Sequence, residues 1–132
     1  MPREAITSGD VPLSHLPFSP AVRAGDLVFV SGQASVDDTG AYLEEDFEGE
    51  MDRSMQNVAR ILAAAGARMD DVVQVRSFLG DITYRDEYNR LYPQYFTAPL
   101  PARTTVSGGI STLKFEVDVV AYAPRRGDDG SR

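Results

Sequence analysis

The stretch Phe115-Glu116-Val117-Asp118-Val119-Val120-Ala121-Tyr122 decides the fold, because its pattern defines both faces of a sheet. Apolar side chains alternate with other side chains along most of it, as they do in a β-strand with one buried face. We expect one face to carry Phe115, Val117, Val119 and Ala121, and the other to carry Glu116, Asp118, Val120 and Tyr122. Helices elsewhere in the chain should cover one face of this sheet.

Three earlier segments are predicted to supply further strands. The apolar run Leu27–Gly32 follows the turn signal Ala24-Gly25-Asp26, which is typical of a hairpin. Val72–Leu79 alternates in part, and Thr104–Val106 precedes the last strand. We expect Ser31-Gly32 at the end of its strand, where backbone amides often become free to bind a ligand.

A first helix is predicted from an apolar stripe with spacings of four, three, four and three residues. Six acidic side chains between Glu44 and Asp52 lie around its start, where the helix dipole favours negative charge, and we interpret them as a solvated helix N-terminus. Gly66 stands where a C-terminal cap belongs. The stripe consists of Met51, Met55, Val58, Leu62 and Ala65.

A second helix is expected after Val72–Leu79. Thr83-Tyr84-Arg85-Asp86 has the form of a capping box, and Pro93 predicts a kink, or an end near Leu91 and a restart. We interpret the tyrosines of this region as packing groups rather than as a platform for stacking bases. The expected stripe consists of Tyr84, Tyr88, Leu91 and Tyr95.

The order of the elements is strands, helix, strand, helix and two strands. This order predicts an α+β or α/β chain in which two helices pack on one face of a mixed sheet. No internal repeat and no interdomain linker interrupts it. We therefore expect a single domain over residues 1–124 and a disordered tail over residues 125–132.

Composition narrows the chemistry. The 132 residues include no Cys, one His (His15, expected in an exposed loop) and one Lys (Lys114), so the chain has no thiolate and no His-rich metal site. The net charge of −7 disfavours binding to nucleic acid. The N-terminal residues 1–4 lack a signal-like apolar run and no apolar run approaches membrane-spanning length, so a cytoplasmic protein with no membrane contact is expected.

Conventional catalytic motifs are missing, and the last two strands hold the most informative pair of residues. An antiparallel hairpin centred on Gly109-Ile110 would place Arg103 directly opposite Glu116 on the same face. Two interpretations remain open at this point. The pair is either a cross-strand salt bridge or part of a small-molecule site, in which Arg binds a carboxylate and Glu orients or deprotonates water.

Five segments in the same order resemble the RidA/YjgF/UK114 (Rid) family. The resemblance runs from about Phe18 to Pro124, nearly the whole domain, and Pro101-Ala102-Arg103 is its most specific element. The other four segments are Val30-Ser31-Gly32-Gln33, the Asn57 helix ending Ala63-Ala64-Ala65-Gly66, Asn89-x-x-Tyr92-x-x-Tyr95-Phe96, and Phe115-Glu116-Val117.

The resemblance implies a chorismate-mutase-like (YjgF-like) α+β fold and a homotrimer whose sites lie in clefts between subunits. It also implies hydrolysis of 2-aminoacrylate and related 2-imino acids to 2-keto acids and ammonia, as by a 2-iminobutanoate/2-iminopropanoate deaminase. The small-molecule partner would be an imino or keto acid, and neither a metal nor an organic cofactor is expected.

The family's roles carry over to matching residues of this chain. Arg103 would hold the substrate carboxylate and Glu116 would position the attacking water. The main chain of Gly32 and Thr105 would hydrogen-bond substrate oxygens. The cleft would also be lined by Ser31, Asn89 and Phe18.

This chain differs from much of the family at three places. Phe18 stands where many members carry Tyr, Thr105 stands where Cys is common, and the 107–112 loop is shortened. Three alternatives to the deaminase therefore stay open. They are a noncatalytic trimer that binds small carboxylates, a pathway-specific protein acting on a larger imine, and the ribonuclease of the family's older label, which the charge, the lone His and the lone Lys disfavour.

Overall fold

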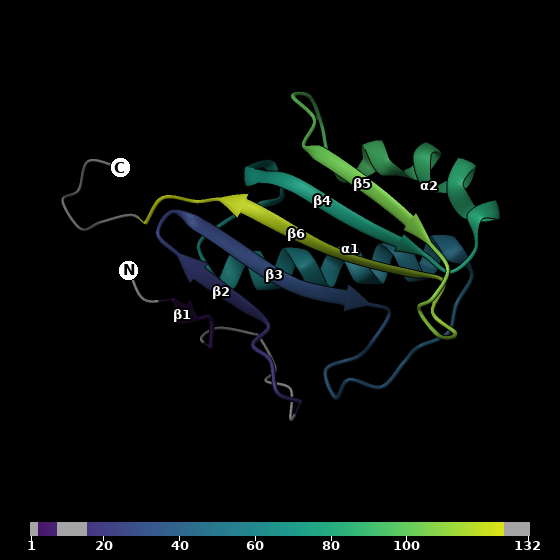
Figure 1. Ribbon diagram of the computed structural model, residues 1–132, viewed down its shortest axis with the longest axis horizontal. Helices are drawn as coiled ribbons and strands as arrows, with labels where there is room; N and C mark the ends of the chain where they lie inside the picture. The colour runs from purple at the N-terminus through teal and green to yellow at the C-terminus, as the bar shows by residue number, and fades with distance from the viewer. Residues whose placement is uncertain (1–2, 8–15, 126–132) are drawn as a thin grey trace.

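A six-stranded mixed sheet forms one layer of the molecule, with the strand order β1-β2-β3-β6-β4-β5. The computed structural model in Figure 1 describes residues 3–7 and 16–125, so His15 and most of the predicted tail lie outside the described residues. The strands are β1 (Glu4–Ala5), β2 (Ala21–Ala24), β3 (Leu27–Ala34), β4 (Val72–Leu79), β5 (Ala102–Ser107) and β6 (Phe115–Tyr122).

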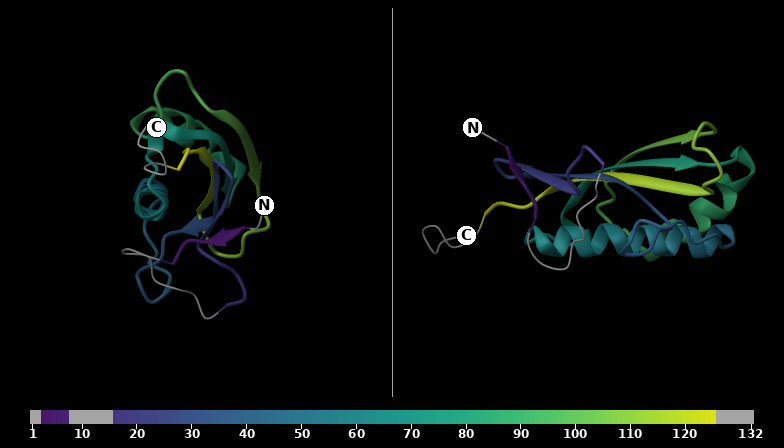
Figure 2. Two further views of the ribbon diagram at one scale, coloured as in Figure 1. Left: turned by 90° about the vertical axis from the view of Figure 1, so that its left-hand side faces the viewer. Right: turned by 90° about the horizontal axis from the view of Figure 1, so that it is seen from below.

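Helices cover one face of this sheet and form the second layer, as Figure 2 shows. The predicted α+β arrangement, a mixed sheet with two helices on one face, is therefore confirmed. No helix in the described part of the chain is long and apolar enough to cross a membrane. The helices are α1 (Phe47–Ala64), α2 (Arg85–Leu91) and the short 3₁₀ turns η1 (Met69–Asp71), η2 (Ile82–Tyr84) and η3 (Tyr92–Gln94).

The strand β6 lies in the centre of the sheet, antiparallel to β3 on one side and to β4 on the other. Its predicted alternation is confirmed, because Phe115, Val117, Val119 and Ala121 are all buried against the helices. We call the opposite side of the sheet the open face. Strand register places on it Leu27, Phe29, Arg76, Phe78, Val106, Glu116, Asp118, Val120 and Tyr122.

The predicted hairpin between the last two strands is wrong. The strand β5 pairs in parallel with β4, which separates it from β6, and Arg103 lies opposite Val75 rather than Glu116. A central strand needs apolar side chains on the face that the helices cover, and β4 supplies Val75 and Leu79 there. The polar β5 is better suited to the edge of the sheet.

Most of the first predicted helix is confirmed. All five residues of its apolar stripe are buried, Asp46 caps the first turn by accepting from the Gly49 amide at 2.9 Å, and Gly66 follows the end with a φ of 79°. The interpretation of the acids as a solvated N-terminus is wrong for Glu50. Its carboxylate is fully buried and bound by the Tyr42 hydroxyl and by the amide and ammonium groups of Lys114.

The start of the second helix differs from the prediction. Thr83 makes no capping box, because Asp81 accepts from the Thr83 amide at 2.8 Å and caps η2 instead. The α-helix then runs from Arg85 to Leu91, where Pro93 ends it, and the chain restarts as η3. This outcome matches the expected end near Leu91. Figure 1 shows α2 next to β5, the edge strand of the sheet, and Arg103 of β5 contacts the rings of Tyr88 and Tyr92.

Candidate active site

The predicted site residues form two groups, and the first lies on the open face around Glu116. Ser31-Gly32 does not end its strand, as the sequence suggested, but lies within β3 at a register shift between Val30 and Gln33. A Cβ at Gly32 would lie 2.2 Å from Oε2 of Glu116. Only a glycine therefore leaves room for the carboxylate in its present position.

Ser31 connects this group to the segment that carries Phe18. Its hydroxyl donates to the Ser19 carbonyl at 2.7 Å, and its amide donates to the Pro20 carbonyl at 2.9 Å. Phe18 itself is 51% exposed. A large apolar side chain with half of its surface open to solvent is available for contact with a ligand or another chain.

Glu116 lies in an environment that favours its protonated form. Burial raises the pKa of its carboxyl group, and the nearby negative charge of Asp118 raises it further. Asp118 is itself held by Arg76 through two hydrogen bonds of 2.9 and 3.0 Å. Among the described residues no cation pairs with Glu116, so the salt bridge to Arg103 that the sequence left open does not form within one chain.

The second group lies on the helix-covered side, at the edge of the sheet. The Arg103 guanidinium carbon lies 4.9 Å from the centre of the Tyr88 ring and 4.8 Å from that of Tyr92. The side chain is exposed, and no carboxylate within residues 3–7 and 16–125 forms an ion pair with it. Its N–H groups are thus available to a planar carboxylate from outside the chain.

Thr105 and Asn89 belong to the side of Arg103. Strand register pairs Thr105 with Ser77, whose side chain is buried on the helix-covered side. Asn89 is exposed on α2, the helix that also carries Tyr88. Within one chain the predicted site is therefore split. Ser31, Gly32 and Glu116 form one group, with Phe18 next to the Ser19 that Ser31 binds, and Asn89, Arg103 and Thr105 form the other.

Sequence reasoning missed the tyrosines that hold Arg103 and the acid that acts on Glu116. Tyr88 and Tyr92 are four residues apart and so share one helix face. This spacing is compatible with a pair of rings that contacts one further side chain. Asp118 is two residues from Glu116 in a strand and therefore shares its face. Neither spacing shows which strand β5 pairs with, so the contact between Arg103 of β5 and the two rings could not be predicted.

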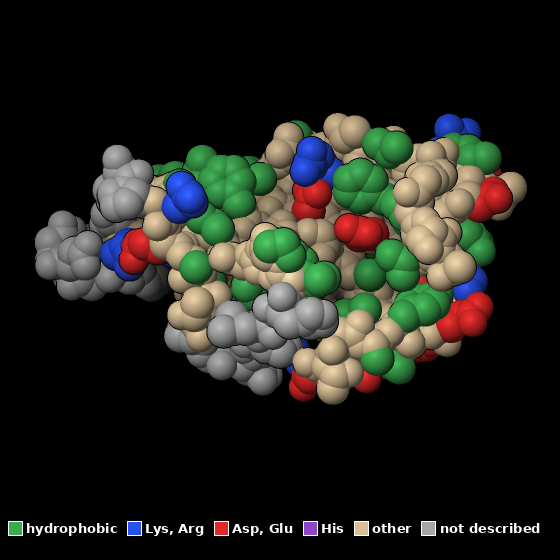
Figure 3. Space-filling model, turned by 60° about the horizontal axis from the view of Figure 1, so that its bottom comes forward, with side chains coloured by type: hydrophobic (Ala, Val, Ile, Leu, Met, Phe, Trp, Pro, Cys, Tyr) green, Lys and Arg blue, Asp and Glu red, His purple; other side chains and the backbone are tan. Residues whose placement is uncertain are grey.

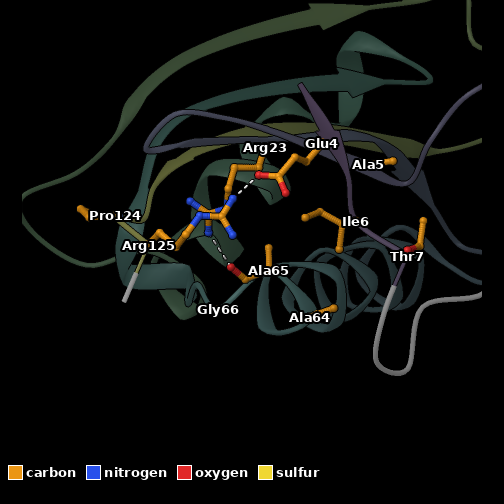
Figure 4. A pocket seen from close by; sticks show the side chains of 10 residues that line it. All are labelled: Glu4, Ala5, Ile6, Thr7, Arg23, Ala64, Ala65, Gly66, Pro124 and Arg125. Carbon is orange, nitrogen blue, oxygen red and sulfur yellow. Dashed lines mark hydrogen bonds and ion pairs between the residues drawn. The ribbon is translucent and has the colours of Figure 1, made fainter. Parts of the chain in front are cut away.

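The cavity in Figure 4 lies away from both groups. It has a volume of about 320 Å³ and lies between β1, the end of α1 and the residues after β6. Its buried Arg23 donates to the carbonyls of Ala65 at 2.8 Å and Ala123 at 2.7 Å, and Arg125 pairs with Glu4. The charged groups of the cavity are therefore bound within the chain. Arg23 has a structural role, because it donates to a carbonyl at the C-terminal end of α1.

The described residues include no group of three or more His, Cys, Asp or Glu side chains that could hold a metal ion. The two groups contain the functional groups of the candidate site. They offer one carboxyl group with a raised pKa, one exposed guanidinium, hydroxyl groups and the backbone. Such groups can bind an anionic substrate and transfer protons.

Comparison with known proteins gives consistent matches over this whole region. The chain matches the family model described as Endoribonuclease L-PSP over residues 8–123. A RutC family protein of Pyrococcus abyssi is 33% identical, with the match covering 92% of this chain and 98% of that protein. The chloroplastic Reactive Intermediate Deaminase A of Arabidopsis thaliana is 30% identical over 92% of this chain, which spans 65% of that protein's length.

Solved structures agree with the sequence matches. The crystal structure of RidA from the Antarctic bacterium Psychrobacter sp. is similar with a TM-score of 0.81 at 26% identity, covering 90% of this chain and 98% of that one. This similarity confirms the expected YjgF-like fold, and the family match includes both groups of site residues. The chain therefore belongs to the RidA/YjgF (Rid) family, whose family model is described as Endoribonuclease L-PSP.

Proposed function

We propose that this protein hydrolyses reactive enamines and imines derived from 2-amino acids, such as 2-aminoacrylate and 2-iminopropanoate, to 2-keto acids and ammonia. The observation that carries the proposal is the pair of complementary groups described above. An exposed Arg103, which has no carboxylate partner among the residues that the structure describes, suits the acid group of such a substrate, and Glu116 has the raised pKa of a general acid and base. A cytoplasmic location belongs to the same proposal.

The two groups meet only if two chains contribute to one site. Arg103 and Glu116 point to opposite sides of the sheet, so no rotation of either side chain brings them together in one chain. The open face also exposes apolar groups, including Phe29 at 43%, Val106 at 47% and Tyr122 at 52%. Figure 3 shows hydrophobic side chains spread over one side of the molecule among acidic and basic groups. An exposed face of this kind supports the homotrimer with clefts between subunits that the family resemblance implies.

In the proposed reaction Arg103 holds the substrate carboxylate through two parallel hydrogen bonds, and the backbone amides of Gly32 and Thr105 bind its oxygens. Ionised Glu116 takes a proton from water, whose oxygen bonds to the iminium carbon to give a carbinolamine. The protonated Glu116 then returns this proton to nitrogen. As the carbon–nitrogen bond breaks and ammonia leaves, Glu116 takes the proton of the hydroxyl group, so that the 2-keto acid forms, and Glu116 then passes this proton to solvent. An imine is already electrophilic, so positioning and one modest base suffice, and no cofactor is needed in any step.

Two further functions are each supported by one feature of the structure. A noncatalytic trimer that binds small carboxylates would use the same exposed Arg103. A larger imine substrate is favoured by the exposed Phe18, which adds apolar surface beside Ser31. We do not assign RNA cleavage, because the net charge of −7 repels a polyanion and the single lysine, Lys114, is paired with Glu44 and Glu50.

One assay separates the enzyme from the binding protein. The substrate 2-iminopropanoate is generated in situ from an amino acid, and its loss is followed with and without protein. The hydrolase predicts an acceleration that Arg103→Ala lowers about 10- to 100-fold, the value of a charge-assisted hydrogen bond. No acceleration, together with pyruvate binding that depends on Arg103, would leave only the binding function. A monomer by light scattering would contradict the shared site.

A further inference from the structure

A corner of two tyrosine rings holds the guanidinium of Arg103, and we propose that Tyr88 and Tyr92 are positioning residues for carboxylate binding. We call these two rings the tyrosine clamp. The proposal rests on the proposed function of Arg103 as the carboxylate ligand. It concerns how one chain prepares that ligand before substrate arrives, and it assigns a role to two side chains that otherwise count as packing.

The clamp contacts Arg103 from two directions. The ring of Tyr88 comes from α2 and that of Tyr92 from η3, and the two rings meet at an angle of 73° with their centres 5.5 Å apart. The guanidinium carbon lies at nearly equal distances from both, 4.9 and 4.8 Å. Contact with two non-parallel rings restricts the side chain more than stacking on a single ring does.

The clamp itself is fixed by the core. Tyr88 is fully buried, and its hydroxyl shares a hydrogen bond of 2.6 Å with the buried hydroxyl of Ser77. Tyr92 is 6% exposed and packs against Phe96, with ring centres 5.0 Å apart. The rings therefore do not move with the surface loops, and they give an exposed arginine a rigid reference in the interior of the protein.

The rigid position of the rings affects binding, because a mobile arginine side chain loses conformational freedom about several bonds when it binds a ligand. An exposed Arg without a partner would have to be ordered by the substrate, which weakens binding. Rings that order the guanidinium beforehand remove part of that loss and leave the charge unneutralised, because aromatic faces do not occupy its N–H groups as a carboxylate would. The arginine is thus both ordered and available for an anion.

The test compares removal of a ring with removal of a hydroxyl. Tyr92→Leu takes away one face of the clamp and leaves no buried partner unsatisfied, because the Tyr92 hydroxyl makes no hydrogen bond within the described residues. Tyr92→Phe and Tyr88→Phe keep the rings. Tyr84→Leu is the matched control, since Tyr84 is a partly buried tyrosine of the same region that stacks on Phe47 rather than on Arg103.

Three quantities are measured on folded protein, whose native state is checked by circular dichroism. They are the Kd for pyruvate by NMR titration, and KM and kcat for 2-iminopropanoate. We expect Tyr92→Leu to raise Kd and KM about two- to fivefold, the range of one cation–π contact, with kcat changed less than twofold. Tyr92→Phe, which keeps the ring, should have the wild-type Kd, KM and kcat. Tyr84→Leu should lower the melting temperature without changing Kd.

The outcomes separate this proposal from the proposed function. If Tyr92→Leu and Tyr84→Leu leave Kd for pyruvate equally unchanged, or raise it equally, the clamp has no specific role and the proposal is overturned. If wild-type protein binds pyruvate but shows no turnover, the hydrolase is refuted, and weaker binding by Tyr92→Leu still supports the clamp. If wild-type protein neither binds pyruvate nor accelerates the loss of 2-iminopropanoate, both proposals fail.

Discussion

Gly32→Ala is the sharpest test of the role assigned to Glu116. The new Cβ would lie 2.2 Å from Oε2 and 3.2 Å from the carboxyl carbon of Glu116. A Cβ is essentially never found closer than 3.0 Å to another heavy atom, so the carboxylate has to move by roughly 1 Å. Because the moving atoms are the end of a flexible side chain, the fold should absorb the change with less than about 1 kcal/mol of lost stability.

The effect on catalysis should be much larger. A displacement of about 1 Å of a reacting group costs up to roughly 100-fold in rate, which corresponds to about 2.7 kcal/mol of transition-state stabilisation. We therefore expect kcat/KM for 2-iminopropanoate to fall by roughly 30- to 100-fold, close to the effect of Glu116→Gln. Pyruvate binding through Arg103 should change little.

Gly25→Ala provides the opposite pattern as a control. Gly25 has a φ of 60° and nothing within 4 Å of an added Cβ, so the substitution strains the backbone of the β2–β3 turn without touching Glu116. It should cost about 1 kcal/mol of stability and leave kcat/KM unchanged. A Gly32→Ala variant with wild-type kcat/KM would refute either the position of the Glu116 carboxylate or its part in the reaction.

Three further predictions concern stability. Burial raises the pKa of Glu116, so the folded state disfavours its charge, and Glu116→Gln should raise the melting temperature at pH 7. That gain should vanish below pH 4.5, the carboxyl's ordinary pKa; a gain at all pH values would contradict this explanation. Tyr92→Phe removes a buried hydroxyl that has no partner in the described part of the chain, so it should be neutral or stabilising by up to about 1 kcal/mol in urea unfolding, whereas a loss of stability would reveal a further hydrogen bond. Glu50→Ala should destabilise by about 3 kcal/mol or more, because it leaves Lys114 and Tyr42 without their buried partner; a loss below about 1 kcal/mol would argue against that network.

Local patterns were enough to predict most of the elements. The strands Val72–Leu79 and Phe115–Tyr122 have the predicted bounds, and the five residues of the α1 stripe are all buried. These features depend on the period of the side chains and on the local effect of Gly66 and Pro93, which act within a few residues of the chain. The family resemblance added the order of the segments and the identity of the candidate residues.

Strand pairing could not be read from the same patterns. The hairpin prediction assumed that neighbouring strands in sequence pair with each other, whereas β4 lies between β5 and β6. The position of Glu50 also escaped prediction, because a charge is buried only where distant groups such as Lys114 supply its hydrogen bonds. Periodicity describes which face of an element is apolar, but not which element it meets.

The sequence by itself excluded thiolate groups and a His-rich metal site, since the chain has no Cys and one His, and left carboxyl, guanidinium, hydroxyl and backbone groups as the candidates. It also pointed to Arg103 and Glu116 as the principal pair. Only the tertiary structure decided that these two residues lie on opposite sides of the sheet, with Arg103 against two tyrosine rings and Glu116 against Gly32. The physical reason is that the face on which a side chain lies depends on the strand register, and the register depends on which strands pair. The apolar face of β4 places it between β5 and β6, beneath the helices.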